Sequence, residues 1–265
     1  MTGRRRGQLS ATAAANGLDL ARLGRSLTGV PRFAADLIRY RRGCRALGIN
    51  VPAFTDLLPV TSDRSEKAGA VDGHYFHQDL WAARKVHRAA PTAHVDVGSR
   101  IDGFVAHVLS FCPVTVVDIR PLSDDIPGLT WVRDDARTLA SFADGSVPSV
   151  SSLHAVEHVG LGRYGDDLDP EGWRSAVAAL QRITAPGGTI YLGLPIGRQR
   201  TCFNAHRVLD PRTVVDALDG CTVVEFSAVT DEGRLVLHAE PDAFQNSDYA
   251  CGLFELRRRT PTAAA

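Results

Sequence analysis

Three side chains that bind metals or move protons lie close together at His154, Glu157 and His158. The apolar stretch 149–153 precedes them and is predicted to form a strand. If a helical turn follows, the three side chains share one face, because positions three and four apart are neighbours on a helix. They then point beyond the carboxyl end of the strand, where ligands bind in open α/β sheets.

The His-x-x-Glu-His spacing has three interpretations: a packed turn, a zinc-protease helix, or a divalent-cation site. A protease helix has to continue beyond both histidines, whereas Gly160 and Gly162 follow almost at once. The packed turn and the cation site therefore remain. Without a metal, His154 is a candidate general base, because histidine changes charge near neutral pH.

The elements that position these residues alternate as in α/β proteins. Strands are expected at 94–97, 113–118, 129–132, 147–153 and 188–194, then at 222–226, 235–238 and 252–256. Helices are expected at 104–109, 170–183 and 211–218. Asp79 is the candidate N-cap of a further helix that runs to about Ala89. The fold class is therefore α/β.

The first strands end in residues typical of a nucleotide site. Asp96 and Gly98 close the first strand, and a glycine there lets the backbone approach a ligand. Asp118 ends the second strand about twenty positions later, the spacing of a carboxylate that accepts hydrogen bonds from ribose hydroxyls. Asp134 and Asp135 form a further acidic turn. The turn after the first strand is not GxGxxG, because the next glycine after Gly98 is Gly103, but this order of residues favours an adenosine-containing ligand.

These stretches resemble the class I S-adenosylmethionine-dependent methyltransferases. The resemblance spans residues 74–257 and rests on five stretches: Val95-Asp-Val-Gly98, Val117-Asp118, Asp134-Asp-Ala136, Leu153-His-Ala-Val-Glu-His158 and Ile183-Thr-Ala-Pro-Gly-Gly-Thr-Ile-Tyr191. It implies a Rossmann-like, mostly parallel seven-stranded sheet of order 3-2-1-4-5-7-6, with the seventh strand antiparallel. The first loop departs from the family pattern, since Arg100 and Asp102 replace its later glycines.

The resemblance implies S-adenosylmethionine as the cofactor. Asp96 and Gly98 are expected at its methionine end, and Asp118 at its ribose hydroxyls. Further cofactor contacts are expected from the neighbouring turns and from a loop before the Asp79 helix: Tyr75, Gln78, Ser99, Ile119, Asp135 and Ala136.

Within this family, the chain looks most like actinobacterial saccharide O-methyltransferases of methylmannose polysaccharide biosynthesis. That likeness rests on the stretches 74–79, 96–100 and 203–207. It implies methylation of a sugar hydroxyl, with four candidate substrate ligands: Arg163, Tyr164, Asn204 and Arg207. The alternative acceptors are RNA ribose or another small molecule, and the alternative function is a non-catalytic cofactor-binding module.

Methyltransferases that act on the RNA 3′-terminal ribose or on ubiquinone-pathway catechols carry Glu-x-x-Glu-His at the 154–158 position and a later histidine. By that resemblance, the candidate ligands of a Mg²⁺ or Mn²⁺ ion are His154, Glu157, His158 and His206, of which the first three are also the candidate catalytic residues. Histidine in place of the first Glu matters, because Mg²⁺ prefers oxygen ligands and imidazole suits manganese, cobalt, zinc or iron. Assistance by a cation and by a His154 base both stay open.

The composition of the chain narrows the classes of partner and compartment that are expected. Lys plus Arg and Asp plus Glu number 30 each, so the formal net charge is zero, which disfavours a nucleic-acid partner. No apolar run has the length of a membrane span, so no membrane partner is expected. The five cysteines lack CxxC spacing, which favours free thiols in a reducing, cytoplasmic compartment. A small saccharide is the expected partner, and a homodimer is the candidate assembly.

The chain is expected to have three segments. Residues 1–73 form an N-terminal helical extension, 74–257 the methyltransferase domain, and 258–265 a loose tail. Within the extension, apolar residues recur at helical spacing from Leu18 to about Leu47, and Pro31 suits the start of a second helix.

Overall fold

The computed structural model describes residues 20–62, 71, 73–122 and 125–260, with side chains from residue 23 onward. The chain divides into two compact units, residues 1–69 and 70–265. Residues 1–19 of the expected extension and 261–265 of the expected tail lie outside the described residues. Each unit is described by itself.

The first unit is built on one long helix, α2 (Leu20–Leu47). Pro31 lies inside this helix, so the prediction that a second helix starts there is wrong. Proline removes one backbone hydrogen bond, but its fixed φ suits a helix, and the helix continues through it. The following segment, which includes η1 (Phe54–Asp56), returns along α2. There the Thr61 hydroxyl donates to the Ser26 carbonyl at 2.8 Å.

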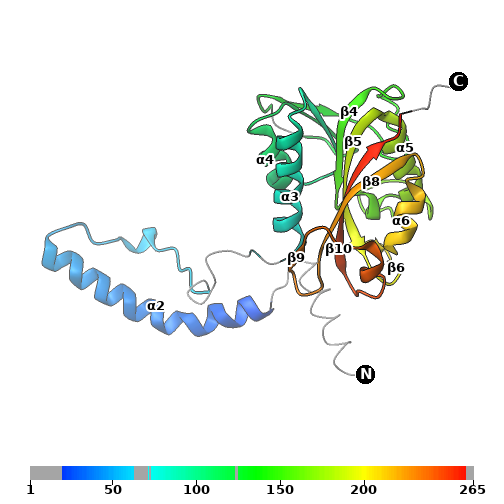
Figure 1. The fold of residues 1–265 in the computed structure, drawn as a ribbon. Helices are drawn as coiled ribbons and strands as arrows, with labels where there is room; N and C mark the ends of the chain where they lie inside the picture. The colour runs from blue at the N-terminus through cyan, green and yellow to red at the C-terminus, as the bar shows by residue number, and fades with distance from the viewer. Residues whose placement is uncertain (1–19, 63–70, 72, 123–124, 261–265) are drawn as a thin grey trace, which may run out of the picture. The chain divides into compact units, whose positions relative to one another are not determined.

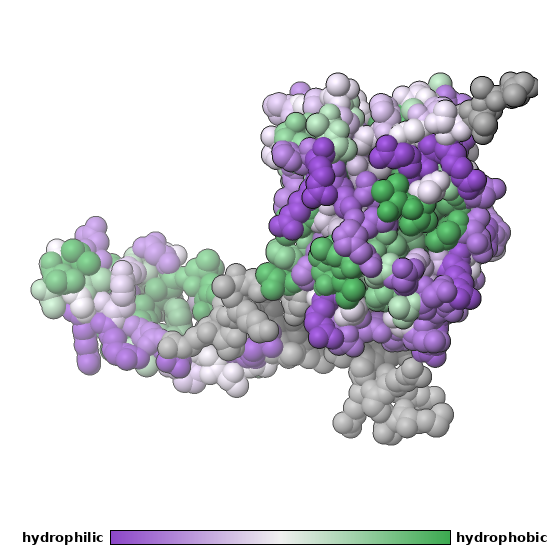
Figure 2. Space-filling model, in the orientation of Figure 1, coloured by the Kyte–Doolittle hydropathy of each residue, from purple (hydrophilic) through white to green (hydrophobic). Residues whose placement is uncertain are grey.

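The described surface of the first unit is mixed. Leu27, Ile38, Phe54 and Leu58 are each more than half exposed. Figure 2 shows hydrophobic residues beside hydrophilic ones along this unit. No helix in the described part of either unit combines the length and apolarity needed to cross a membrane.

An eight-stranded sheet forms the centre of the described part of the second unit (Figure 1). In spatial order its strands are β3 (Leu129–Val132), β2 (Val114–Val117), β1 (His94–Val97), β4 (Val147–Leu153), β5 (Thr184–Ile196), β10 (Ala250–Arg258), β8 (Cys221–Val229) and β9 (Leu235–Val236). The first five pair in parallel, whereas β10 is antiparallel to both of its neighbours. This is the predicted order 3-2-1-4-5-7-6 with β10 as the seventh strand. The protein therefore has the Rossmann-like methyltransferase fold, and β9 adds an eighth strand at the edge.

Helices cover both faces of this sheet, as Figure 1 shows. One face carries α3 (His74–Ala89), the π-helical turn η3 (Ile101–Val105) and α4 (Ala106–Leu109). The other carries α5 (Gly172–Ile183) and α6 (Pro211–Ala217), and two short turns, η4 (Val156–His158) and η5 (Pro241–Phe244), complete the helical elements. Successive residues of β10 enter different cores: Leu253 packs with Trp81 of α3, and Phe254 belongs to the core of Val177 and Leu180 of α5. Successive side chains of a strand point to opposite faces, so both faces of the sheet are buried.

Two segments near the carboxyl ends of the strands differ from expectation. Residues 74–78, expected in a loop, form the first turns of α3, and Asp79 lies inside the helix and is not its N-cap. The helix starts after Gly73. The φ of this residue is 97°, a backbone conformation that glycine adopts readily. After β5, the short strands β6 (Arg200–Cys202) and β7 (His206–Val208) form an antiparallel hairpin. Polar strands this short have no apolar alternation that a sequence pattern could detect.

Candidate functional site

A cavity of about 410 Å³ opens at the carboxyl ends of β1 to β4. Open α/β sheets bind ligands at this position. Most of the predicted site residues line the cavity: Tyr75, Gly98, Ser99, Asp118, Ile119, Asp135, Ala136, His154, Glu157, His158, Arg163, Tyr164 and His206. Four predicted residues lie outside the lining: Gln78, Asp96, Asn204 and Arg207.

One wall of the cavity is the turn after β1. Gly98 has a φ of 74°, and a methyl group there would lie 2.9 Å from the methyl of Ala155, so only glycine fits. Asp96 is fully buried beneath the turn. Its carboxylate accepts hydrogen bonds from the Ser99 amide at 3.0 Å and the Ser151 hydroxyl at 2.6 Å. Burial raises the pKa of Asp96 to about 6. Asp96 therefore shapes the turn, and Ser99 faces the cavity.

A second wall carries two carboxylates, each held by the arginine two residues later. Asp118 accepts hydrogen bonds from the Arg120 amide at 2.8 Å and from its guanidinium at 2.6 Å. Asp135 is held by Arg137 in the same way, at 2.8 and 2.6 Å, and these bonds lower the pKa of Asp135. The repeated Asp-x-Arg arrangement fixes a carboxylate at the end of β2 and another after β3.

Arginine and tyrosine side chains form the more exposed rim of the cavity. The guanidinium groups of Arg120 and Arg163 lie 4.5 and 5.0 Å from the centroid of the Tyr164 ring. Arg100 lies 5.0 Å from the centroid of Tyr75. Such cation–π contacts are modest at exposed sites. The rim therefore offers aromatic faces and hydrogen-bond donors that a ligand can share.

The floor of the cavity begins at His154, directly after β4. Its φ of 51° is the left-handed conformation, which is uncommon for residues other than glycine. His154 Nδ1 lies 2.7 Å from Glu157 Oε1, and its Nε2 lies 3.1 Å from His74 Nδ1. In turn, His74 Nε2 lies 3.0 Å from the carbonyl oxygen of Tyr249. A chain of hydrogen bonds therefore runs from Tyr249, just before β10, through both histidines to Glu157.

Hydrogen-bond polarity fixes the protons along this chain. The Tyr249 carbonyl only accepts, so His74 Nε2 donates and its Nδ1 accepts from His154. Burial lowers the pKa of His74 to about 4, which keeps that ring neutral. Burial also opposes charge on His154, yet Cys251 and Glu157 raise the pKa of His154 well above its usual value. With both nitrogens donating, His154 has no free lone pair with which to act as a base.

Glu157 is the counter-charge of His154. Burial opposes its ionisation, but His154 keeps the pKa of Glu157 below its usual value. Its second oxygen, Oε2, is buried and has no hydrogen-bond partner among the described residues. Buried polar atoms normally have a partner, so this oxygen is a position for a ligand donor.

His158 also lies on the floor of the cavity, and one of its ring nitrogens has a free lone pair. Its Nδ1 lies 2.6 Å from the carbonyl oxygen of Ala205, so Nδ1 carries a proton and donates it. Burial lowers the pKa of His158, and the ring is neutral at pH 7. Nε2 therefore bears a lone pair, 3.6 Å from Glu157 Oε1. His158, rather than His154, has the protonation state of a general base.

The other predicted site residues separate into two groups. His206 lines the cavity, and its ring packs on Tyr249 with centroids 4.9 Å apart. Asn204 is exposed in the turn between β6 and β7. Gln78 is buried in α3, where its amide donates to Asp79 at 3.2 Å. These last two lie away from the ligand space.

Arg207 has a structural position in place of the predicted substrate contact. Its side chain is buried. The guanidinium donates to four main-chain carbonyls, those of Glu157, Val159, Asp169 and Pro170. Arg207 therefore ties β7 to the floor of the cavity and to the end of the following loop.

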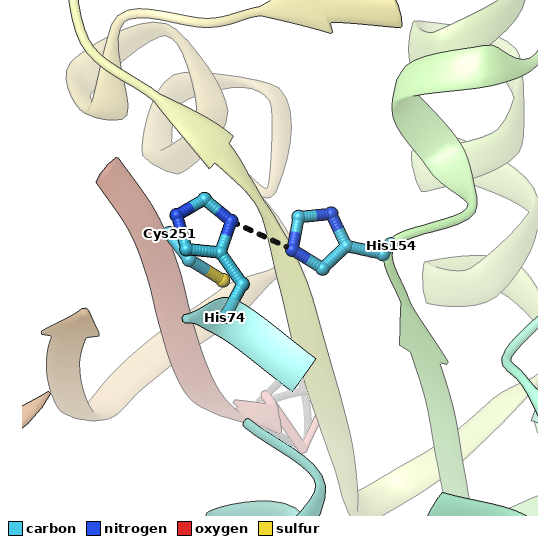
Figure 3. Close-up of side chains that lie close together, drawn as sticks. All are labelled: His74, His154 and Cys251. Carbon is cyan, nitrogen blue, oxygen red and sulfur yellow. Dashed lines mark hydrogen bonds between the residues drawn. The ribbon is translucent and has the colours of Figure 1, made fainter. Parts of the chain in front are cut away.

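Of the predicted cation ligands, only His154 belongs to a cluster of three ligand atoms among the described residues. In the described parts of the chain, the one group of three ligand atoms within 4.8 Å of each other is that of His74, His154 and Cys251 (Figure 3). Glu157, His158 and His206 are not part of it. The Mg²⁺ or Mn²⁺ site expected from the sequence, with three histidines and one glutamate, stays a prediction.

Sequence reasoning missed several residues of the site. Arg120 repeats the Asp-x-Arg spacing of Asp135 and Arg137, and this repeat is visible in the sequence. His74, Ala205 and Tyr249 have no such signal, because their partners lie 47 to 175 positions away.

Comparisons with known proteins are limited to parts of the chain. A family model described as a Caenorhabditis protein of unknown function, DUF268, matches residues 134–244. No curated protein matches the sequence. The structure is similar to that of the N-methyltransferase NodS from Bradyrhizobium japonicum WM9 in complex with S-adenosyl-L-homocysteine, with 16% identity and a TM-score of 0.49 over 71% of this chain and 90% of that one. It is also similar to the 1,6-didemethyltoxoflavin-N1-methyltransferase of Burkholderia thailandensis, with 14% identity and a TM-score of 0.48 over 69% of this chain and 79% of that one.

Proposed function

We propose that the protein is an S-adenosylmethionine-dependent O-methyltransferase that acts on a sugar hydroxyl. The observation that carries the proposal is one cavity with two different ends. One end holds the carboxylates Asp118 and Asp135, and the other holds the neutral base His158 beside Glu157. The first end suits a nucleoside, and the second suits a hydroxyl that has to lose a proton.

The cofactor would lie along the strand ends. Asp118 accepts hydrogen bonds from the ribose hydroxyls. These hydroxyls either share the carboxylate with Arg120 or displace the exposed Arg120 side chain from it. The adenine edge lies at Asp135, and the methionine end lies at the Gly98 turn, where the missing side chain leaves room. S-adenosylmethionine supplies an activated methyl group on a sulfonium, so the protein has to align the acceptor and manage its proton.

His158 performs the proton transfer in this proposal. The acceptor hydroxyl donates to His158 Nε2, and Glu157 Oε2 holds a second donor of the acceptor. As the O–CH₃ bond forms and the CH₃–S bond breaks, the hydroxyl proton passes to Nε2 and the sulfonium becomes a neutral thioether. Glu157 Oε1, 3.6 Å from Nε2, stabilises the imidazolium that forms. No divalent cation is required.

The rim of the cavity supports a saccharide as the acceptor. Sugars bind through their apolar C–H faces on aromatic rings and through hydrogen bonds from charged side chains. Tyr75, Tyr164 and Tyr249 supply rings, and Arg100 and Arg163 supply donors. A mannoside, as in methylmannose polysaccharide, is the acceptor that the sequence resemblance favours.

Two measurements test the proposal. Calorimetry should show saturable binding of S-adenosylmethionine. Transfer of a labelled methyl group should then be found with short mannosides or other oligosaccharides, without added Mg²⁺ or Mn²⁺. Cofactor binding without transfer to any glycan or small-molecule acceptor would favour a non-catalytic module. Absence of cofactor binding would reject the proposal altogether.

A further inference from the structure

Three potential metal ligands lie next to the floor of the cavity, outside the set that the sequence predicts. His74 comes from the start of α3, His154 from the end of β4, and Cys251 from β10. Their ligand atoms all lie within 4.8 Å of one another. Figure 3 shows the two imidazoles side by side with the sulfur next to them.

We propose that these three side chains bind a zinc ion, which takes the place of the proton between the two imidazoles. Two imidazole nitrogens on one tetrahedral zinc lie about 3.3 Å apart, and His74 Nδ1 and His154 Nε2 lie 3.1 Å apart. The two ring planes differ by 5°, so the rings are nearly parallel and their facing nitrogens can turn to one ion. Zinc places a thiolate about 3.6 Å from each such nitrogen. The Cys251 sulfur has to approach by about 1 Å, which a small rotation about Cα–Cβ provides.

The outer partners of both histidines match those of metal-bound histidines. A ligating histidine donates its second N–H to a carboxylate or a main-chain carbonyl, which fixes its tautomer and orientation. His154 Nδ1 has Glu157 Oε1 at 2.7 Å. His74 Nε2 has the Tyr249 carbonyl at 3.0 Å. Both second nitrogens are therefore already held, and both remaining nitrogens face the same point.

The donor set selects the metal. Two imidazoles and a thiolate suit zinc, whereas magnesium and calcium prefer oxygen. Binding displaces the proton between the imidazoles, and Cys251 binds as its thiolate. The thiolate and the Glu157 carboxylate then balance the two charges of the ion.

The ion would join three segments that are distant in sequence. It would hold His154 in its left-handed conformation and keep Glu157 turned toward His158. Its fourth position is open to water or to a ligand atom, as in zinc sites with three protein ligands. The zinc site does not depend on the proposed methyl transfer.

Cobalt replaces zinc as a spectroscopic probe. Metal-free full-length protein titrated with Co²⁺ should bind about one equivalent and show visible bands of tetrahedral cobalt with a sulfur-to-cobalt charge-transfer band. Zn²⁺ should displace it, and protein purified from zinc-supplemented medium should contain zinc. Cys251→Ser should lose the charge-transfer band, and His74→Ala should bind Co²⁺ at least about tenfold more weakly.

Two matched variants serve as controls. Cys202→Ser removes a thiol outside the group, and His206→Ala removes a histidine that lines the cavity, so both should keep the wild-type cobalt spectrum. Circular dichroism establishes that each variant is folded. A folded wild type without the charge-transfer band, or a band that persists in Cys251→Ser, would overturn the zinc site and leave a proton between the imidazoles. The binding of S-adenosylmethionine, measured separately, decides the proposed function.

Discussion

His158 Nδ1 lies 2.6 Å from the carbonyl oxygen of Ala205, in the turn of a hairpin 47 residues later. This contact orients the ring and leaves Nε2 as its lone-pair nitrogen. Arg163 donates to the same carbonyl at 2.9 Å. The hairpin thereby sets the tautomer of a side chain in η4, the turn after β4.

His158→Ala should reduce methyl transfer by about 10²–10⁴-fold, the usual contribution of a general base. Binding of S-adenosylmethionine should remain close to wild type, because the ring serves the acceptor. His206→Ala is the matched control. It removes a second histidine from the cavity lining, and His206 is not assigned as a base. Labelled-methyl transfer and calorimetry measure the two effects. Equal losses in the two variants would contradict the assignment of His158.

The pH dependence of methyl transfer should show one acid limb. Burial lowers the pKa of His158 below the ordinary 6.5, and transfer needs the neutral ring. Activity should therefore be flat around neutral pH and fall as the pH drops through a value below 6.5. The pH profile of kcat/KM measures this. A limb centred above 6.5 would show that another group titrates.

Asp118→Ala should weaken the binding of S-adenosylmethionine by about 10- to 100-fold, the effect of losing hydrogen bonds to a charged group. The control is Asp102→Ala, because Asp102 makes a similar arginine pair but is well exposed. Calorimetry should show near-wild-type affinity for the control. If both variants bind the cofactor equally, Asp118 does not hold the ribose.

Gly98→Ala should lower both stability and cofactor affinity. The new methyl group combines an unfavourable φ of 74° with a 2.9 Å contact to Ala155. Gly187→Ala separates the two effects, because its φ is 75° but nothing lies within 4 Å. The strain alone should cost about 1–2 kcal/mol in urea unfolding, and Gly98→Ala should cost more. A smaller loss at Gly98 than at Gly187 would mean that the turn can relax.

Arg207→Met should destabilise the fold by about 3 kcal/mol, because it removes the hydrogen bonds of a buried guanidinium to four buried or partly buried main-chain carbonyls. Arg212→Met provides the comparison: the Arg212 side chain pairs at the surface with Asp242 at 2.6 Å, so its loss should leave stability close to wild type. Chemical denaturation of both variants measures the difference. Substrate binding by Arg207, the expectation from sequence, would instead show as a raised KM with unchanged stability.

The sequence by itself determined the sheet and most of the cavity lining. Parallel strands place their carboxyl ends at one edge, so Gly98, Asp118, Asp135 and His154 had to meet there once the strands were found. Each of these residues follows its strand within a few positions. Local pattern is enough for such residues, because the strand carries them to the edge.

Only the tertiary structure decided the hydrogen-bond partners and protonation states of these side chains. The state of His154 depends on His74, and that of His158 on Ala205, partners 80 and 47 positions away. Arg207, which the sequence predicts as a substrate ligand, is buried against main-chain carbonyls. Proton positions follow from burial and from the polarity of the nearest partner, and both are set by packing between segments that the sequence keeps far apart.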